Sequence, residues 1–180
     1  MNAALLADAQ RELGKMPSVL ENLLGGLDTQ GARTRPALAE WSPVEIVCHL
    51  RDEETEDFGA RLRVILSGAD SFVRIDPERW AEERRYREAS LPEALGAFRS
   101  RREESLDLLR SIAPEALDGS RSHGRLGRLS GLDLVAAWVA HDRIHLAQLA
   151  ATLARVWTLR WAPLRTDYAG PIPYPPDPKT

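Results

Sequence analysis

Four stretches of this sequence place their apolar residues on one side of a helix, and that spacing restricts the chain to a helical fold. The first stretch steps alternately by three and four residues through Leu6, Ala9, Leu13, Met16, Leu20 and Leu23. Such steps are typical of a helix with a narrow buried face. Gly25-Gly26 then provide a C-terminal stop. Similar apolar arcs occupy residues 42–68, 90–112 and 130–156.

The sequence also contains start signals for the three later helices. Ser42-Pro43-Val44-Glu45 combines an N-cap serine, a proline at the first helical position and a capping-box glutamate. Ser90-Leu91-Pro92-Glu93 repeats that pattern, and Ser130-Gly131-Leu132-Asp133 begins the last helix. These start signals agree with the apolar arcs that follow them.

No strand is expected, because apolar and polar residues do not alternate over any sustained run and β-branched residues are few. We expect residues 69–89 to form a long connection with a short helix, and the Gly-rich stretch 119–131 to form a loop. The fold class is therefore all-α, a four-helix bundle with long connections. Residues 1–160 would form this single domain. Residues 161–180, with six prolines in the last 18 positions, would form an extended tail.

The charge balance excludes several classes of partner. With 24 basic and 27 acidic residues, the chain has no electrostatic reason to bind nucleic acid or an anionic membrane. Three arginine clusters, at 84–87, 99–102 and 121–128, stand out, and the first two are interpreted as solvated helix faces because acidic residues surround them. No run of ~20 apolar residues is available for a membrane span.

The cysteine content and the N-terminal residues indicate the cellular compartment of the protein. Cys48 is the one cysteine, so no intramolecular disulfide can form. The first ten residues lack a basic region, and Asp8 interrupts their apolar residues, unlike a secretory signal. We therefore expect a cytoplasmic protein.

Three of the four histidines lie in predicted helices and suggest a metal site. His141 and His145 are spaced i, i+4, which places both imidazoles on one face of the last helix. His49 lies on the core-facing side of the second helix. A single inward histidine is more often a hydrogen-bonded core residue, but three on two helices favour a divalent metal held by His49, His141 and His145. His123 lies in the Gly-rich stretch and is interpreted as structural or exposed.

A line of polar residues accompanies His49. Glu53, Asp57 and Arg61 follow it at four-residue steps along an otherwise apolar arc. Buried without partners they would cost several kcal/mol, so we expect paired charges or a metal-linked network there, with Asp142 and Gln148 contributing from the last helix.

Two catalytic motifs are excluded. The sequence HDRIH (141–145) lacks the glutamate of the HExxH metalloprotease motif. Cys48 points about 100° away from His49 on a helix, which excludes a Cys–His nucleophile pair.

The segments WSPVEIVCHLRDEE (41–54) and AAWVAHDRIHLAQL (136–149) resemble the two signature helices of the DinB/YfiT-like superfamily. RLGRLSGLDL (125–134) is similar as well, and the resemblance covers roughly residues 5–157. It implies an up-up-down-down type of four-helix bundle. It also implies a divalent metal, often zinc or nickel, bound by one histidine of the second helix and two of the last, which correspond to His49, His141 and His145.

The resemblance implies metal-dependent chemistry on a small-molecule substrate. The family includes thiol-dependent S-transferases and isomerases, so we expect the metal to activate a low-molecular-weight thiol that attacks a small electrophile. Two alternatives stay open: a metal-dependent hydrolase with water as nucleophile, and a non-enzymatic metal- or ligand-binding stress protein.

Supporting residues and assembly can be assigned only as candidates. The candidates for orienting the imidazoles, by accepting a hydrogen bond from the ring nitrogen that does not bind the metal, are Asp52, Glu53 and Asp142. Arg143 is a candidate for holding an anionic cofactor tail. A homodimer is expected, but no catalytic residue beyond the metal ligands can be assigned.

Overall fold

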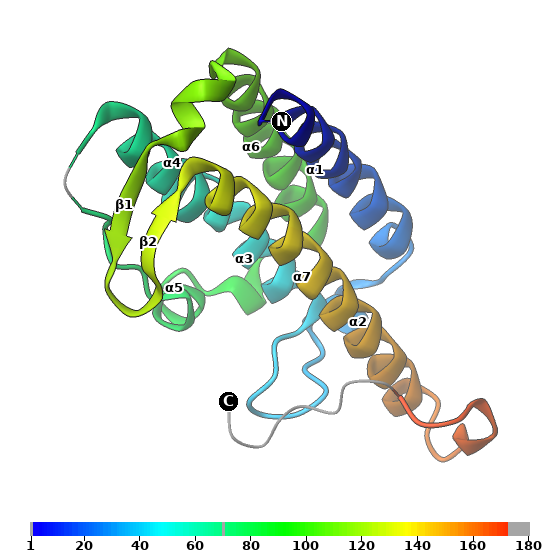
Figure 1. The fold of residues 1–180 in the computed structure, drawn as a ribbon. Coiled ribbons are helices and arrows are strands. Elements are labelled where there is room, and N and C mark those ends of the chain that lie inside the picture. The colour runs from blue at the N-terminus through cyan, green and yellow to red at the C-terminus, as the bar shows by residue number, and fades with distance from the viewer. Residues whose placement is uncertain (1, 70, 173–180) are drawn as a thin grey trace.

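The computed structural model describes residues 2–69 and 71–172 (Figure 1). Four long helical segments dominate it, as the sequence predicts. The α-helices are α1 (Asn2–Leu24), α2 (Thr29–Arg33), α3 (Pro43–Glu53), α4 (Gly59–Ser67), α5 (Pro77–Glu83), α6 (Leu91–Ser111) and α7 (Gly131–Arg160). A π-helical turn (Glu54–Phe58) joins α3 directly to α4, so these two act as one long helix. The strands are β1 (Ser120–His123) and β2 (Gly127–Ser130).

Side-chain contacts define the directions of the four long helices. Arg102 of α6 reaches Leu13 and Arg99 reaches Glu21, so α1 and α6 are antiparallel. Arg143 of α7 pairs with Glu12 and Arg160 pairs with Asp28, so α1 and α7 run the same way.

In α3 and α4, Leu50 clusters with Phe98 of α6, and Leu62 clusters with Leu109 further along α6, which makes these helices parallel. The order along the chain is therefore up-down-down-up, and the expected up-up-down-down arrangement is wrong. Residues 71–90, which include α5, lead back along the bundle to the start of α6, so α6 can repeat the direction of α3 (Figure 1).

Two apolar clusters form the core, one at each end of the bundle. Each long helix contributes to both: Met16 and Leu13 of α1 lie in different clusters, and so do Phe98 and Leu106 of α6. The residues between these apolar positions include Glu54, Arg102 and His141. The bundle thus has a polar layer between two apolar clusters, and this layer contains the candidate site.

The helix boundaries largely follow the predicted signals. The capping boxes at Ser42–Glu45 and Ser130–Asp133 are present. Ser90 precedes α6 but makes no side-chain cap hydrogen bond, so the capping box predicted there is wrong. In α1, Leu24 is buried whereas Leu23 is 40% exposed. The last buried residue of this helix is therefore Leu24, and the prediction of Leu23 is wrong.

The Gly-rich stretch forms an antiparallel β-hairpin instead of the predicted loop. Ser120 pairs with Ser130 and His123 with Gly127. Each strand has four residues, and neither has a buried face. The sequence therefore shows no alternation of apolar and polar residues from which the strands could be predicted.

The division into a bundle (1–160) and an extended tail (161–180) stays a prediction. The helix α7 ends at Arg160, and residues 161–172 contain a single 3-10 turn, Asp167–Ala169. The rest of the predicted tail, residues 173–180, lies outside the described residues. Within the described ranges, no helix is long and apolar enough to span a bilayer.

Candidate metal centre

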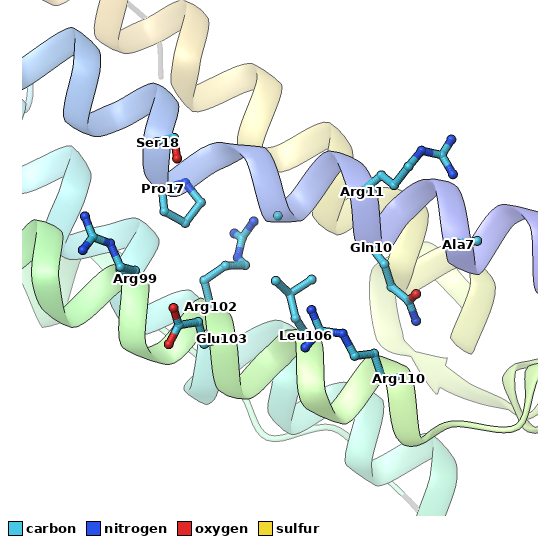
Figure 2. A pocket seen from close by; sticks show the side chains of 11 residues that line it. Ala7, Gln10, Arg11, Pro17, Ser18, Arg99, Arg102, Glu103, Leu106 and Arg110 are labelled. Carbon is cyan, nitrogen blue, oxygen red and sulfur yellow. The ribbon is translucent and has the colours of Figure 1, made fainter.

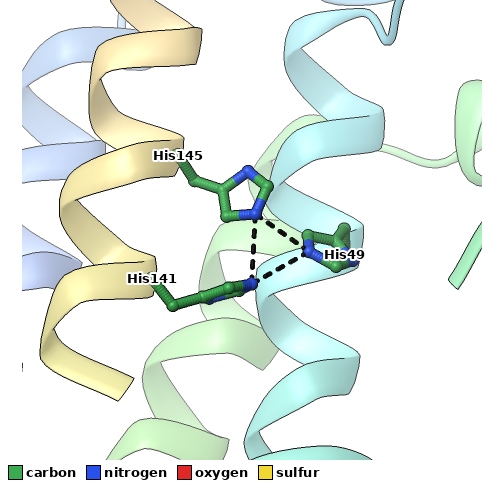
Figure 3. Close-up of side chains that lie close together, drawn as sticks. All are labelled: His49, His141 and His145. Carbon is green, nitrogen blue, oxygen red and sulfur yellow. Dashed lines mark hydrogen bonds between the residues drawn. The ribbon is translucent and has the colours of Figure 1, made fainter. Parts of the chain in front are cut away.

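Three imidazoles meet between α3 and α7 (Figure 3). The Nε2 atom of His49 lies 3.2 Å from Nε2 of His141 and 3.1 Å from Nε2 of His145, and the last two are 3.1 Å apart. His49 is supplied by α3, while the i, i+4 pair comes from adjacent turns of α7. The sequence prediction that these three residues converge is therefore correct in geometry.

Hydrogen bonding alone does not account for this triangle. A neutral Nε2 either carries a proton and donates, or carries a lone pair and accepts. Among three mutually close nitrogens, at least one pair must then be of the same kind, with two protons or two lone pairs facing each other. A cation removes the conflict by accepting all three lone pairs.

The nitrogen separations also fit a metal ion. Nitrogen ligands about 2.0–2.1 Å from a tetrahedral zinc lie roughly 3.3 Å apart, close to the separations here. The three ligand atoms form the only group of three or more His, Cys, Asp or Glu ligands within 4.8 Å of one another in the described part of the chain. The residues present therefore fit one divalent transition metal.

The surroundings keep these histidines neutral. Burial, followed by the neighbouring His145, lowers the pKa of His49 to about 3. Burial and the two other histidines lower the pKa of His141 to about 2, and burial also lowers the pKa of His145. Neutral imidazoles retain the lone pairs that a metal requires.

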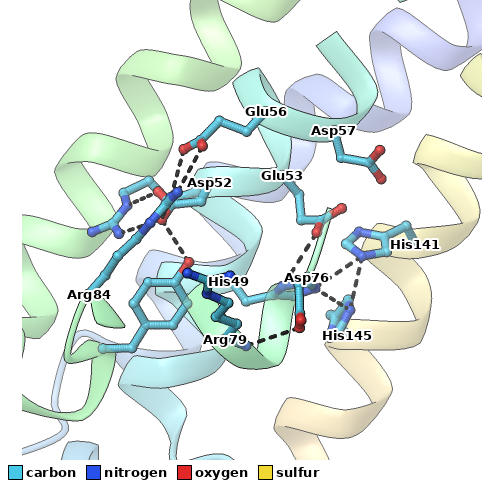
Figure 4. Close-up of polar contacts among 12 residues, drawn as sticks. His49, Asp52, Glu53, Glu56, Asp57, Asp76, Arg79, Arg84, His141 and His145 are labelled. Atoms are coloured by element: carbon cyan, nitrogen blue, oxygen red, sulfur yellow. Dashed lines mark hydrogen bonds and ion pairs between the residues drawn. The ribbon is translucent and has the colours of Figure 1, made fainter. Parts of the chain in front are cut away.

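The far nitrogens of two imidazoles face acceptors. Nδ1 of His145 lies 2.7 Å from Oε1 of Gln148, which assigns its proton to Nδ1 and leaves Nε2 free to bind. Nδ1 of His49 lies 3.7 Å from Oε1 of Glu53, one turn along α3 (Figure 4). The side chain of Glu53 is buried, and burial followed by the neighbouring Asp57 raises the pKa of its carboxyl group to about 9.

The other two candidates for orienting the imidazoles are bound to arginines. Asp52 accepts hydrogen bonds from Arg51, Arg84 and Arg101 and from the Tyr86 hydroxyl, on the side of α3 away from the histidines (Figure 4). Asp142 binds Arg102 at 2.6 Å. Both carboxylates therefore help hold the helices together, and neither has a hydrogen bond to a histidine within the described residues.

The interpretation of the arginine cluster 99–102 as a solvated helix face is wrong for Arg102. Arg102 is fully buried and binds both Glu54 and Asp142. Trp138 also donates to Glu54, at 3.0 Å. Of the polar line predicted beside His49, Arg61 pairs with Asp57, whereas Oε1 of Glu53 has no hydrogen-bond partner among the described residues.

Comparison with known proteins agrees with this fold. The family model of the DinB superfamily matches residues 12–149, most of the chain. The chain belongs to the DinB superfamily. No curated protein matches it. Among solved structures it is similar to YfiT from Bacillus subtilis, which is described as a probable metal-dependent hydrolase with an unusual four-helix bundle topology. The TM-score is 0.75 at 16% identity, over 87% of this chain and 89% of YfiT.

The remaining candidate residues of this DinB-superfamily chain lie apart from the histidines. Arg143 is exposed and pairs with Glu12 of α1. Cys48 is buried, and burial raises the pKa of its thiol to about 11, which agrees with its rejection as a nucleophile. His123 lies in β1, where its ring faces Phe72 at 6.0 Å between centroids.

A groove of about 740 Å³ runs between α1 and α6 (Figure 2). Its lining residues are Ala7, Gln10, Arg11, Gly14, Pro17, Ser18, Arg99, Arg102, Glu103, Leu106 and Arg110. The arginines there are already paired, for example Arg11 with Asp8 and Arg110 with Asp107. No histidine of the cluster lines this groove, so it is separate from the candidate metal centre.

Proposed function

We propose that this protein is a metal-dependent enzyme in which His49, His141 and His145 hold one divalent transition metal, with zinc or nickel as the expected ion. The observation that carries the proposal is the triangle of three Nε2 atoms at 3.1–3.2 Å. A set of three protein ligands is typical of catalytic zinc sites, because structural sites are usually closed by four.

The residues of the site would perform three tasks. The three imidazoles bind through Nε2 and stay neutral because they are buried. Gln148 fixes the ring of His145 by accepting from Nδ1. The rings of Trp41 and Phe58, with centroids 4.9 Å from His49 and 5.0 Å from His141, exclude water from two sides. When bound, the metal would supply Lewis acidity that lowers the pKa of a coordinated thiol or water.

A low-molecular-weight thiol is the nucleophile we favour, acting on a small electrophile in a transfer or isomerisation. Neutral imidazoles bring no negative charge to the site, so a thiolate would balance a divalent cation. The chain's own thiol is unsuitable, because Cys48 is buried and its pKa is raised. Hydrolysis with water as nucleophile is the second candidate, favoured by the structural similarity to YfiT, a probable metal-dependent hydrolase. A homodimer and a cytoplasmic location remain predictions.

A cobalt-substituted sample separates these candidates. Titration with N-acetylcysteine should produce a sulfur-to-cobalt charge-transfer band in the wild type and in Cys48→Ser, but not in His141→Ala. The Cys48→Ser control shows that the added thiol is the sulfur source. Absence of the band, together with metal-dependent cleavage of amides or esters, would replace thiol transfer by hydrolysis. A closed coordination sphere with neither behaviour would favour the non-enzymatic metal-binding protein.

A further inference from the structure

Two buried polar atoms beside the histidine triangle lack hydrogen-bond partners within residues 2–69 and 71–172. They are Nδ1 of His49 and Oε1 of Glu53. Each costs free energy when buried alone. They lie 3.7 Å apart, one turn apart on α3, and the glutamate side chain is only 4% exposed. An imidazole N–H and a carboxyl oxygen are complementary, so each can satisfy the other.

The triangle determines which form of His49 is present when a metal is bound. Its Nε2 faces the two other Nε2 atoms, so Nε2 must supply a lone pair. A neutral imidazole carries one proton, which must then be on Nδ1. Nδ1 becomes a donor directed at the side where Glu53 lies.

The other helix already shows the corresponding arrangement. Nδ1 of His145 is 2.7 Å from Oε1 of Gln148, three residues further along α7. Gln148 and Glu53 are thus related to their histidines in the same way, one helical turn towards the C-terminus. The difference is that the contact to Gln148 is a hydrogen bond of 2.7 Å, whereas the contact to Glu53, at 3.7 Å, is about 0.5 Å beyond the usual hydrogen-bond range.

We propose that Glu53 is a positioning residue that accepts a hydrogen bond from Nδ1 of His49 when the site binds metal, an inference that rests on the proposed metal site. A small rotation of the carboxyl group closes the gap. Oε1 can accept whether the carboxyl is ionised or protonated, so the role does not depend on its charge. Asp57, Asp52 and Arg61 also surround Glu53, but the histidine is the partner for its unpaired oxygen.

The test compares zinc affinity, by chelator competition, in the wild type and four variants. Glu53→Met removes the acceptor and should weaken binding 10–100-fold, the range typical when such a supporting contact is lost. Glu53→Gln keeps an acceptor oxygen and should stay within about 3-fold of the wild type. Gln148→Leu should lose affinity as Glu53→Met does. Glu56→Gln, which changes a carboxyl group that pairs with Arg84 on the side away from the histidines, is the matched control and should bind as the wild type.

Two further readouts separate positioning from folding. The metal-free Glu53→Met protein should be at least as stable as the wild type, because it no longer buries a carboxyl group. In the zinc-loaded wild type, nitrogen-15 NMR should show His49 protonated at Nδ1, with a proton shift that moves upfield in Glu53→Gln.

The outcomes are distinct. If the wild type binds zinc and Glu53→Met binds it equally well, or if His49 is protonated at Nε2, the positioning role is wrong while the metal site stands. If the wild type does not bind zinc, the proposed function itself fails.

Discussion

Arg102 donates a hydrogen bond from Nη1 to the carbonyl oxygen of Leu13, at 2.9 Å. Pro17 lies four residues further along α1 and has no N–H, so that carbonyl lacks its usual helical partner. The same buried guanidinium binds Glu54 and Asp142. The Arg102 side chain of α6 thus satisfies the free carbonyl of α1 and links Asp142 of α7 to Glu54 of the π-helical turn. These contacts lie in the same polar layer as the histidines.

Replacing Arg102 by methionine should therefore destabilise the protein strongly. Removing one partner of a buried ionic cluster typically costs ~3–5 kcal/mol. Urea denaturation measures the loss. Arg110→Met on the same helix is the control, because Arg110 is exposed and, among the described residues, forms an ion pair with Asp107 alone. It should change stability by less than about 0.5 kcal/mol. Equal effects of the two changes would contradict a stabilising role for the cluster.

Pro17→Ala should reduce the loss of stability that Arg102→Met causes. Alanine restores an N–H that can bond the Leu13 carbonyl, so this oxygen no longer needs the guanidinium. In a double-mutant cycle with Arg102→Met, we expect a coupling of about 1 kcal/mol, the net value of one hydrogen bond. Additive effects in the cycle would show that Pro17 and Arg102 act independently.

Tyr86→Phe tests the contacts around Asp52. The Tyr86 hydroxyl donates to the buried carboxylate at 2.7 Å. Losing a hydrogen bond to a charged group should cost about 1.5 kcal/mol, because three arginines still bind Asp52. The same chemical change at the fully exposed Tyr168 is the control and should be neutral. A neutral result at both positions would contradict a role for this hydroxyl.

The capping glutamate Glu45 gives a pH-dependent prediction. Burial would raise the pKa of Glu45, but hydrogen bonds from Arg35 and Ser42 hold it below the usual value. The folded state therefore favours the ionised form, and its contribution to stability is present above pH ~4.5 and lost as pH falls below that value. Glu45→Gln should cost about 1–2 kcal/mol at pH 7.

The cost of Glu45→Gln should become smaller as pH falls from 7 towards the lowered pKa of the folded state, because the wild type then loses the same contribution. Glu104→Gln, at an exposed position of α6, should show little effect at any of these pH values. Denaturation curves at pH 7 and at a series of values below pH ~4.5 check this. A cost that does not change with pH would show that the carboxylate charge is unimportant to the cap.

The sequence predicted the long helices and the histidine cluster because both depend on local spacing. His141 and His145 need only an i, i+4 relation, and the apolar arcs need only helical periodicity. The partner of Glu54 depends instead on how α6 packs, and no local pattern distinguishes Arg102 from its exposed neighbours.

The π-helical turn is a second feature that a regular helical projection does not reveal. It adds a residue to the turn between His49 and Phe58 and brings Glu54, Asp57 and Phe58 to buried positions. A projection with a constant 100° per residue assigned Glu53 and Asp57 to the polar line, but it takes no account of the extra residue in a π-helical turn. The hairpin of β1 and β2 was missed because it lacks an apolar face.

The central claim is a metal bound by three histidines, and metal content measures it most directly. Protein expressed without an affinity tag in metal-replete medium should contain about one equivalent of divalent transition metal per chain. His141→Ala should contain almost none, whereas His123→Ala, which removes a histidine outside the cluster, should keep the full equivalent. A wild type with no bound metal, or a His141→Ala variant that retains it, would contradict the account.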